Sequence, residues 1–98
     1  MHPGLLQQLL AASNPKLRSY AVRVVGRWSD RLADPLAILE QTITDPHPRV
    51  RLETIVAASE VPNARAMGIA ARALNSPMDR FQNHALAECT AVLAPYWI

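Results

Sequence analysis

The sequence predicts an all-α fold, an α-solenoid of about three antiparallel helix pairs, and three observations support this. The segment from Asn14 to Ala21 matches the segment from His47 to Thr54, with a proline followed by a basic residue, an aliphatic residue and an arginine. The two segments begin 33 residues apart, at positions 14 and 47. A repeat period of about this length is typical of stacked helical units. Pairs of Asn or Asp with proline, which favour helix starts, recur along the chain. Signals for strands are lacking, since there is neither an alternating β-branched run nor an Asn-Gly hairpin turn.

The apolar periodicity and the end signals predict six helices within a single domain of residues 1–98. We expect helix caps at Asn14, Asp34, Asp45, Asn63 and Ser76, the last in a capping box with Asp79. The predicted helices run over about 4–12, 15–28, 35–44, 46–60, 64–75 and 77–93. They form three units, at about 4–28, 35–60 and 64–93.

The apolar residues at helical spacing also predict which face of each helix is buried. The predicted inner faces are Leu17, Ala21, Val24, Val25 and Trp28 in the second helix; Leu36, Leu39 and Ile43 in the third; Val50, Thr54, Ala57 and Ala58 in the fourth; Met67, Ala70, Ala71 and Leu74 in the fifth; and Phe81, Ala85 and Cys89 in the sixth. The small inner residues, mostly alanines, would let neighbouring units approach closely.

The composition excludes several classes of protein. Half of the residues are apolar and 18% are charged, as in a folded chain, and the net charge is only +2. That charge is too small to demand a nucleic-acid or membrane partner. A single cysteine excludes an internal disulfide. No apolar run approaches the length of a membrane span, and no signal peptide is visible, so the sequence leaves the compartment open.

The repeated segment resembles HEAT repeats, whose second helix begins with a proline-led turn, an aliphatic residue and an arginine. The closest match to that pattern is Asp45-Pro46-His47-Pro48-Arg49-Val50-Arg51-Leu52-Glu53. The copy that starts at Asn14 is a good match, and the third copy is degenerate because Gln82 replaces the arginine. The resemblance covers nearly the whole chain.

A narrower likeness concerns the same run together with Ser76-Pro77-Met78-Asp79-Arg80-Phe81, Ala85-Leu86 and Leu93-Ala94-Pro95-Tyr96-Trp97. This combination is similar to the HEAT-like segment of large exported bacterial proteins that join a sugar-dehydrogenase-like propeller to a c-type haem domain. The likeness implies a module without catalytic residues and a periplasmic or exported location. It implies no cofactor in this segment, and the chain has no Cys-x-x-Cys-His haem motif.

Arg18 and Arg51 occupy equivalent positions of the repeat. They could form a basic row that binds an anionic partner. Alternatively, they could form a structural ladder in which each arginine reaches a carboxylate or helix-end carbonyls of the adjoining unit, such as Asp45 or Asp79. The periodic placement and the behaviour of the family favour the structural ladder.

Three further arginines, Arg23, Arg27 and Arg31, would lie on one face if the second helix extended that far. Together with Lys16 and Arg49 they could track phosphates, as in the HEAT-like DNA glycosylases. Acidic residues nearby and the scarcity of aromatic residues make nucleic acid an unlikely partner and favour a solvated charged face. A small nucleic-acid-binding module of this glycosylase type is the alternative function.

The sequence predicts neither a catalytic nor a metal site. His2, His47 and His84 match no metal-ligand spacing, and we expect His47 in the first turn of a helix and His84 partly facing its neighbour. Cys89 lies on an apolar stripe and is expected to behave as a small buried hydrophobic residue. Trp28 is expected in the core.

Tyr96 and Trp97 complete the candidate interaction surface with Arg23, Arg27 and Arg31. Because tryptophan and tyrosine dominate interface hot spots, these two aromatic residues could be interface anchors, or they could close the core at the end of the helix.

We therefore expect a non-enzymatic scaffold or spacer that contacts a protein partner or neighbouring domains of the same polypeptide, with no membrane contact. Neither predicted end of the solenoid has the polar face that a terminal unit needs. The sequence accordingly favours a fragment of a longer protein or self-association through an uncapped end.

Overall fold

The computed structural model describes the backbone of residues 3–76 and 78–97 and the side chains of residues 5–76 and 78–96. This part of the chain is all-helical, as predicted, with no strand. Its helices are α1 (Pro3–Leu10), α2 (Pro15–Arg27), α3 (Pro35–Thr42), α4 (Pro48–Ser59), α5 (Ala64–Ala71) and α6 (Arg80–Trp97). Two 3-10 helices, η1 (Ser29–Arg31) and η2 (Arg72–Asn75), follow α2 and α5.

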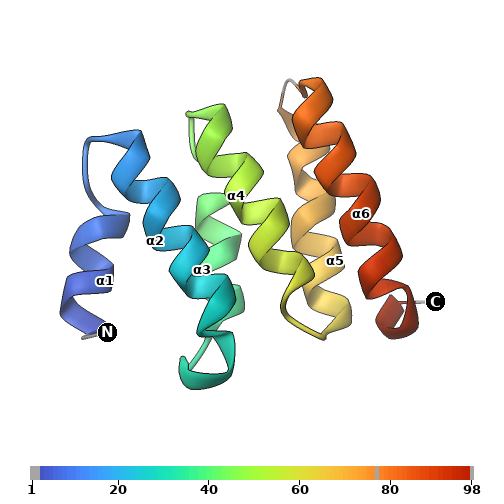
Figure 1. Ribbon diagram of the computed structural model, residues 1–98, viewed down its shortest axis with the longest axis horizontal. Coiled ribbons are helices and arrows are strands. Elements are labelled where there is room, and N and C mark those ends of the chain that lie inside the picture. Colours follow the sequence, from blue (N-terminus) through green and yellow to red (C-terminus); the bar gives the residue numbers. More distant parts are fainter. Residues whose placement is uncertain (1–2, 77, 98) are drawn as a thin grey trace.

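The helices form three successive antiparallel pairs that lie side by side (Figure 1). The second helices of the pairs make one layer, in which α4 lies between α2 and α6 and packs against both. In the other layer α3 contacts α5. Arg65 of α5 pairs with Glu40 of α3 across this second layer. The result is the stacked-pair architecture of an α-solenoid.

Three of the predicted helix caps are confirmed. The side chains of Asn14, Asp34 and Asn63 accept hydrogen bonds from backbone N–H groups of the first turns of α2, α3 and α5. Pro15 and Pro35 then occupy the first helical positions, where a missing N–H costs nothing.

The predicted start of the fourth helix is wrong, because His47 and not Asp45 caps α4. His47 Nδ1 accepts from the N–H of Arg49, and Asp45 Oδ1 accepts from the N–H of His47. The cause is Pro48, because a residue that precedes proline is excluded from the α-helical region. His47 is accordingly extended (φ −91°, ψ 126°), so the helix cannot begin before Pro48.

The predicted ends of the sixth helix are also wrong. Asp79 Oδ1 accepts from the N–H of Gln82, so Asp79 is itself the cap and α6 begins at Arg80. Ser76 is extended (φ −122°, ψ 160°) and ends η2, and Pro77 lies outside the described residues. At its other end α6 continues past Leu93 to Trp97 and tolerates Pro95 in its last turn.

The core lies between the two layers and is centred on α4. The predicted inner faces of α3 and α4 are confirmed, and Ala21, Val25 and Cys89 are buried as expected. The other buried apolar residues include Leu6, Val22, Ile55, Ala66, Ile69, Ala73 and Leu93.

Three predicted core positions are wrong in a consistent way. Leu17, Trp28 and Phe81 are exposed, and smaller or polar neighbours are buried instead. Over α5 and η2 the buried face is shifted by one residue from the predicted one, so Leu74 of η2 is a fourth predicted core residue that is exposed, while Ala73 is buried.

Gly26 explains how closely two units approach. A Cβ atom at this position would lie 2.9 Å from both Cα and Cβ of Ala57. The backbones of α2 and α4 therefore touch at a position where only glycine fits.

Candidate functional site

Arg18 joins the first unit to the second. Its Nε and Nη2 donate to the two carboxylate oxygens of Asp45 at 2.8 and 3.1 Å, which is a bidentate ion pair. Its Nη1 donates to the carbonyls of Ala12 and Ser13 at 2.9 and 3.0 Å. The hydrogen bond with Asp45 raises the pKa of Arg18, while burial opposes the rise.

Arg51 repeats half of this arrangement. Its Nη1 donates to the carbonyls of Asp45 and Pro46 at 2.8 and 3.1 Å, as Arg18 does with its own loop. Its Nε is buried and has no partner among the described residues. It makes no hydrogen bond with Asp79, whose carboxylate caps α6. Gln82, the equivalent residue of the third unit, donates instead to the carbonyl of Pro48 at 2.7 Å.

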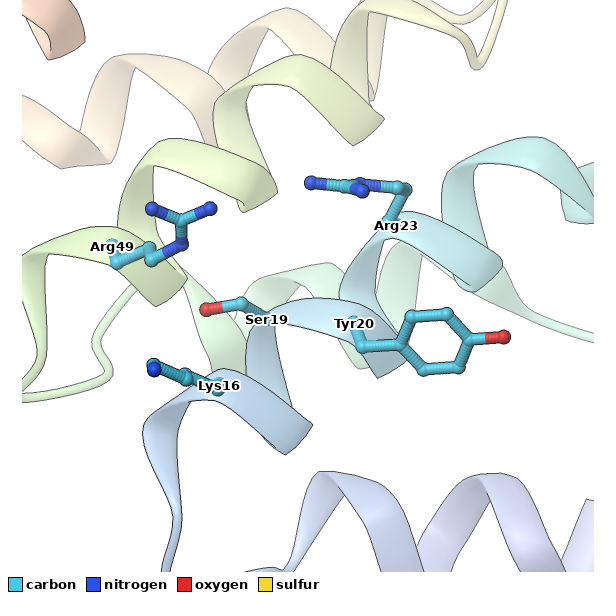
Figure 2. A pocket seen from close by; sticks show the side chains of 5 residues that line it. All are labelled: Lys16, Ser19, Tyr20, Arg23 and Arg49. Atoms are coloured by element: carbon cyan, nitrogen blue, oxygen red, sulfur yellow. The ribbon is translucent and has the colours of Figure 1, made fainter.

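The cations on the outer surface of α2 and α4 surround a pocket of about 410 Å³. Figure 2 shows its lining, with Lys16, Ser19, Tyr20 and Arg23 on α2 and Arg49 on α4. The hydroxyl oxygen of Ser19 points towards the side on which Lys16 and Arg49 lie, and the Tyr20 ring points away from them. Ser19 and Tyr20 were not among the site residues predicted from the sequence. The sequence signal for a site on this surface was the basic residue that follows the proline in both copies of the repeat, Lys16 and Arg49.

The three arginines of the candidate stripe do not all lie on one helix. α2 ends at Arg27, and Arg31 lies in η1, where its guanidinium stacks 4.8 Å from the centre of the Trp28 ring. Arg23 forms an ion pair with Glu53 at 2.9 Å. The hydrogen bond with Glu53 and its charge raise the pKa of Arg23. Only Arg23 of the three lines the pocket.

A second hollow, of about 860 Å³, lies between α1, η1 and α3. Its lining is mostly apolar and includes Leu6, Leu10, Leu32 and Ile38, and Arg31 and Asp34 also line it. The described residues of α1 and α3 make no extensive contact with each other here, whereas α3 and α5 pack together.

The outer face of α6 carries exposed apolar residues at helical spacing. Phe81, Val92 and Tyr96 are all exposed and fall on one side of the helix. Tyr96 is exposed and therefore does not close the core at the end of the helix. The side chain of Trp97 lies outside the described part of the chain.

The thiol and the imidazoles form no catalytic arrangement among the described side chains. Burial raises the pKa of Cys89 to about 11, which keeps the thiol protonated at neutral pH. His84 is exposed, contrary to its expected contact with a neighbouring helix, and its Nε2 lies 2.9 Å from Glu88. His47 is the cap of α4, and His2 lies outside the described residues. No group of three or more His, Cys, Asp or Glu residues in the described part could hold a metal ion. No helix of that part is long and apolar enough to cross a membrane.

Comparison with known proteins agrees with this architecture. A family model described as HEAT repeats matches residues 2–89. The chain belongs to the HEAT repeat family. HEAT repeats are in general scaffolds for protein interaction and are typically non-enzymatic. No curated protein and no solved structure matches the chain.

Proposed function

We propose that this HEAT repeat chain is a non-catalytic scaffold or spacer that contacts a helical unit of a protein partner or of a neighbouring domain. The contact surface is the outer face of α6, defined by Phe81, Val92 and Tyr96. The proposal rests on a comparison of equivalent positions in the three units.

One repeat position carries the argument. Leu17, Val50 and Phe81 are equivalent in the alignment of the units, and their relative exposures are 44%, 0% and 59%. The middle unit has a neighbour on each side and buries this residue, whereas the outer units have one neighbour and expose it. Trp28, Val61 and Val92 follow the same order, exposed, buried and exposed. Phe81 and Val92 therefore have the apolar character of an interior unit, which supports a further helical unit as the occupant.

The likeness to exported proteins with a propeller and a haem domain supports the spacer form of this proposal. In that setting the occupant is a neighbouring domain, and the chain is periplasmic or exported. A nucleic-acid role receives less support, since Arg31 lies outside α2 and Arg23 is paired with Glu53.

The test is affinity capture from nuclease-treated extract of the source organism. The baits are the wild-type chain, the double variant Phe81→Ser/Tyr96→Ser, and Leu74→Ser as a matched control. Leu74 is 64% exposed but lies on η2, so its variant loses a similar apolar surface elsewhere. We expect one protein that the wild type and the Leu74 variant retain and the double variant loses. Because all three residues are exposed, circular dichroism should show unchanged folding.

Two outcomes would contradict the proposal. One is capture that disappears with nuclease, which would move the function to nucleic acid. The other is equal capture by all three baits. Sedimentation of the purified chain tests whether the occupant is a second copy of this chain. A dimer that forms with the wild type but not with the double variant would identify that second copy, and not a different protein, as the partner.

A further inference from the structure

The pocket on α2 and α4 holds unpaired positive charge. Lys16 and Arg49 form no ion pair with any described residue, whereas the other pocket cation, Arg23, is held by Glu53. The pocket lining contains no acidic residue. An anion that enters between α2 and α4 therefore meets two cations without competition from a carboxylate of the lining.

The helix dipoles add to this charge. α2 and α4 begin at the same edge of the molecule (Figure 1), so their positive ends lie near each other. A helix start favours acidic residues, yet neither first turn contains one, and Lys16 and Arg49 occupy equivalent places in the two turns. Lys16 and Arg49 therefore add positive charge at two helix starts that already favour anions.

Ser19 supplies an independent observation. The residue is only 4% exposed, and its Oγ has no hydrogen-bond partner among the described residues. A buried hydroxyl without a partner is costly, and most such groups are satisfied by the protein or by a ligand. Ser19 is one of the residues that line the pocket, and its hydroxyl points towards the side of Lys16 and Arg49 (Figure 2).

We propose that this pocket binds a phosphate monoester carried by a protein partner, that is, a phosphorylated serine or threonine side chain. Lys16 and Arg49 pair with the dianion, the hydroxyl of Ser19 donates to a phosphate oxygen, and Tyr20 borders the path of the partner's chain. The inference deepens the proposed scaffold function and rests on it. A protein is favoured over nucleic acid because the site is isolated. Arg27 and Arg31 do not line it, and Glu53 partly neutralises Arg23.

The probes are inorganic phosphate and two short alanine peptides, identical except for a central phosphoserine or serine. They are titrated into the intact chain at constant ionic strength while backbone amide shifts are followed by NMR. We expect saturable shifts at residues 16–23 and 49–53 with phosphate and with the phosphoserine peptide but not with the serine peptide. Lys16→Gln/Arg49→Gln should weaken binding by about tenfold or more, as for the loss of hydrogen bonds to charged groups. Arg72→Gln, which removes an exposed cation outside the pocket, should have no effect.

Ser19→Ala separates a ligand-binding role from a structural one. Removing an unsatisfied buried hydroxyl should raise the thermal midpoint of the free chain and weaken phosphate binding, whereas a structural hydroxyl would lower the midpoint. Shifts that chloride reproduces, or that Arg72→Gln reduces equally, would overturn the site. Tighter binding of a short duplex DNA than of the phosphoserine peptide would overturn the partner class. If the chain fails to bind phosphate while Phe81→Ser/Tyr96→Ser still abolishes capture of the partner protein, the phosphate site is contradicted and the proposed scaffold function is not.

Discussion

At the scale of single residues, the arginines show how one repeat position does similar work in successive units. Arg18 and Arg51 each donate to two loop carbonyls of their own unit, and these carbonyls occupy equivalent positions in the two units. Only Arg18 also reaches a carboxylate, that of Asp45. The equivalent of Asp45 in the third unit is Ser76, which explains why Arg51 keeps a buried Nε without a partner.

Ser76→Asp should therefore complete the ladder. A carboxylate at position 76 would accept from Arg51 Nε, as Asp45 accepts from Arg18 Nε. We expect a gain of about 1–2 kcal/mol in the free energy of unfolding, since a buried charged donor gains a partner. Urea denaturation measures it, with Asn75→Asp as a control that adds the same charge one residue away. Equal effects of the two variants would show that the ladder is not extended.

The two helical glycines whose surroundings are known should respond in opposite directions to alanine. In Gly26→Ala the new methyl group meets Ala57 at 2.9 Å, so α2 and α4 must separate. We expect a loss of about 1–3 kcal/mol, as for overpacking of a core. In Gly68→Ala nothing lies within 4 Å, and the gain in helix propensity should stabilise by about 0.5–1 kcal/mol. Chemical denaturation of both variants checks this pair, and a stabilising Gly26→Ala would contradict the close approach.

Cys89 predicts a stability change at alkaline pH. Its pKa is raised from 9.0 to about 11 by burial, so the folded state disfavours the thiolate. The contribution is fully present below pH 9 and is lost as pH rises towards 11, because the unfolded chain ionises first. The wild type should lose stability across this window relative to Cys89→Ala, as measured by urea denaturation at several pH values. Parallel curves for the two proteins would contradict a buried thiol.

At the scale of elements, most helices could be predicted, and the misses have physical causes. Caps at Asn14, Asp34 and Asn63 were predictable because each is followed by clear helical periodicity. The start of α4 was missed because two candidate starts, Asp45-Pro46 and His47-Pro48, follow each other directly. Only the constraint that Pro48 places on the backbone of His47 decides between them. The shifted face of α5 was not predictable, since alanines fill both sides and tertiary contacts choose between them.

The position of α4 predicts an order of local stability. This helix contacts α2, α3, α5 and α6, whereas α1 is in substantial contact only with α2. Amides of α4 should therefore exchange slowest with solvent deuterium, near the limit set by global unfolding, and those of α1 fastest. Hydrogen exchange followed by NMR resolves this order. Protection of α1 equal to that of α4 would mean that α1 is held by contacts other than those described.

At the scale of the whole molecule, the fold could be predicted because the sequence contains a repeat. The match between Asn14–Ala21 and His47–Thr54 and the family match over residues 2–89 describe the same architecture. The candidate site was less predictable. Lys16 and Arg49 were visible as cations near helix starts, but their convergence with Ser19 depends on how α2 lies on α4. Pairings between units, such as Arg23 with Glu53, likewise require the packed structure.

The most direct test of the scaffold function is site-specific photo-crosslinking in the source organism. A benzophenone amino acid replaces Tyr96 on the outer face of α6, and Leu74 in a control chain. The proposed scaffold function predicts a covalent protein adduct of defined mass from position 96 that nuclease does not remove, and no adduct of that mass from position 74. Absence of a protein adduct at position 96, or the same adduct from both positions, would contradict it.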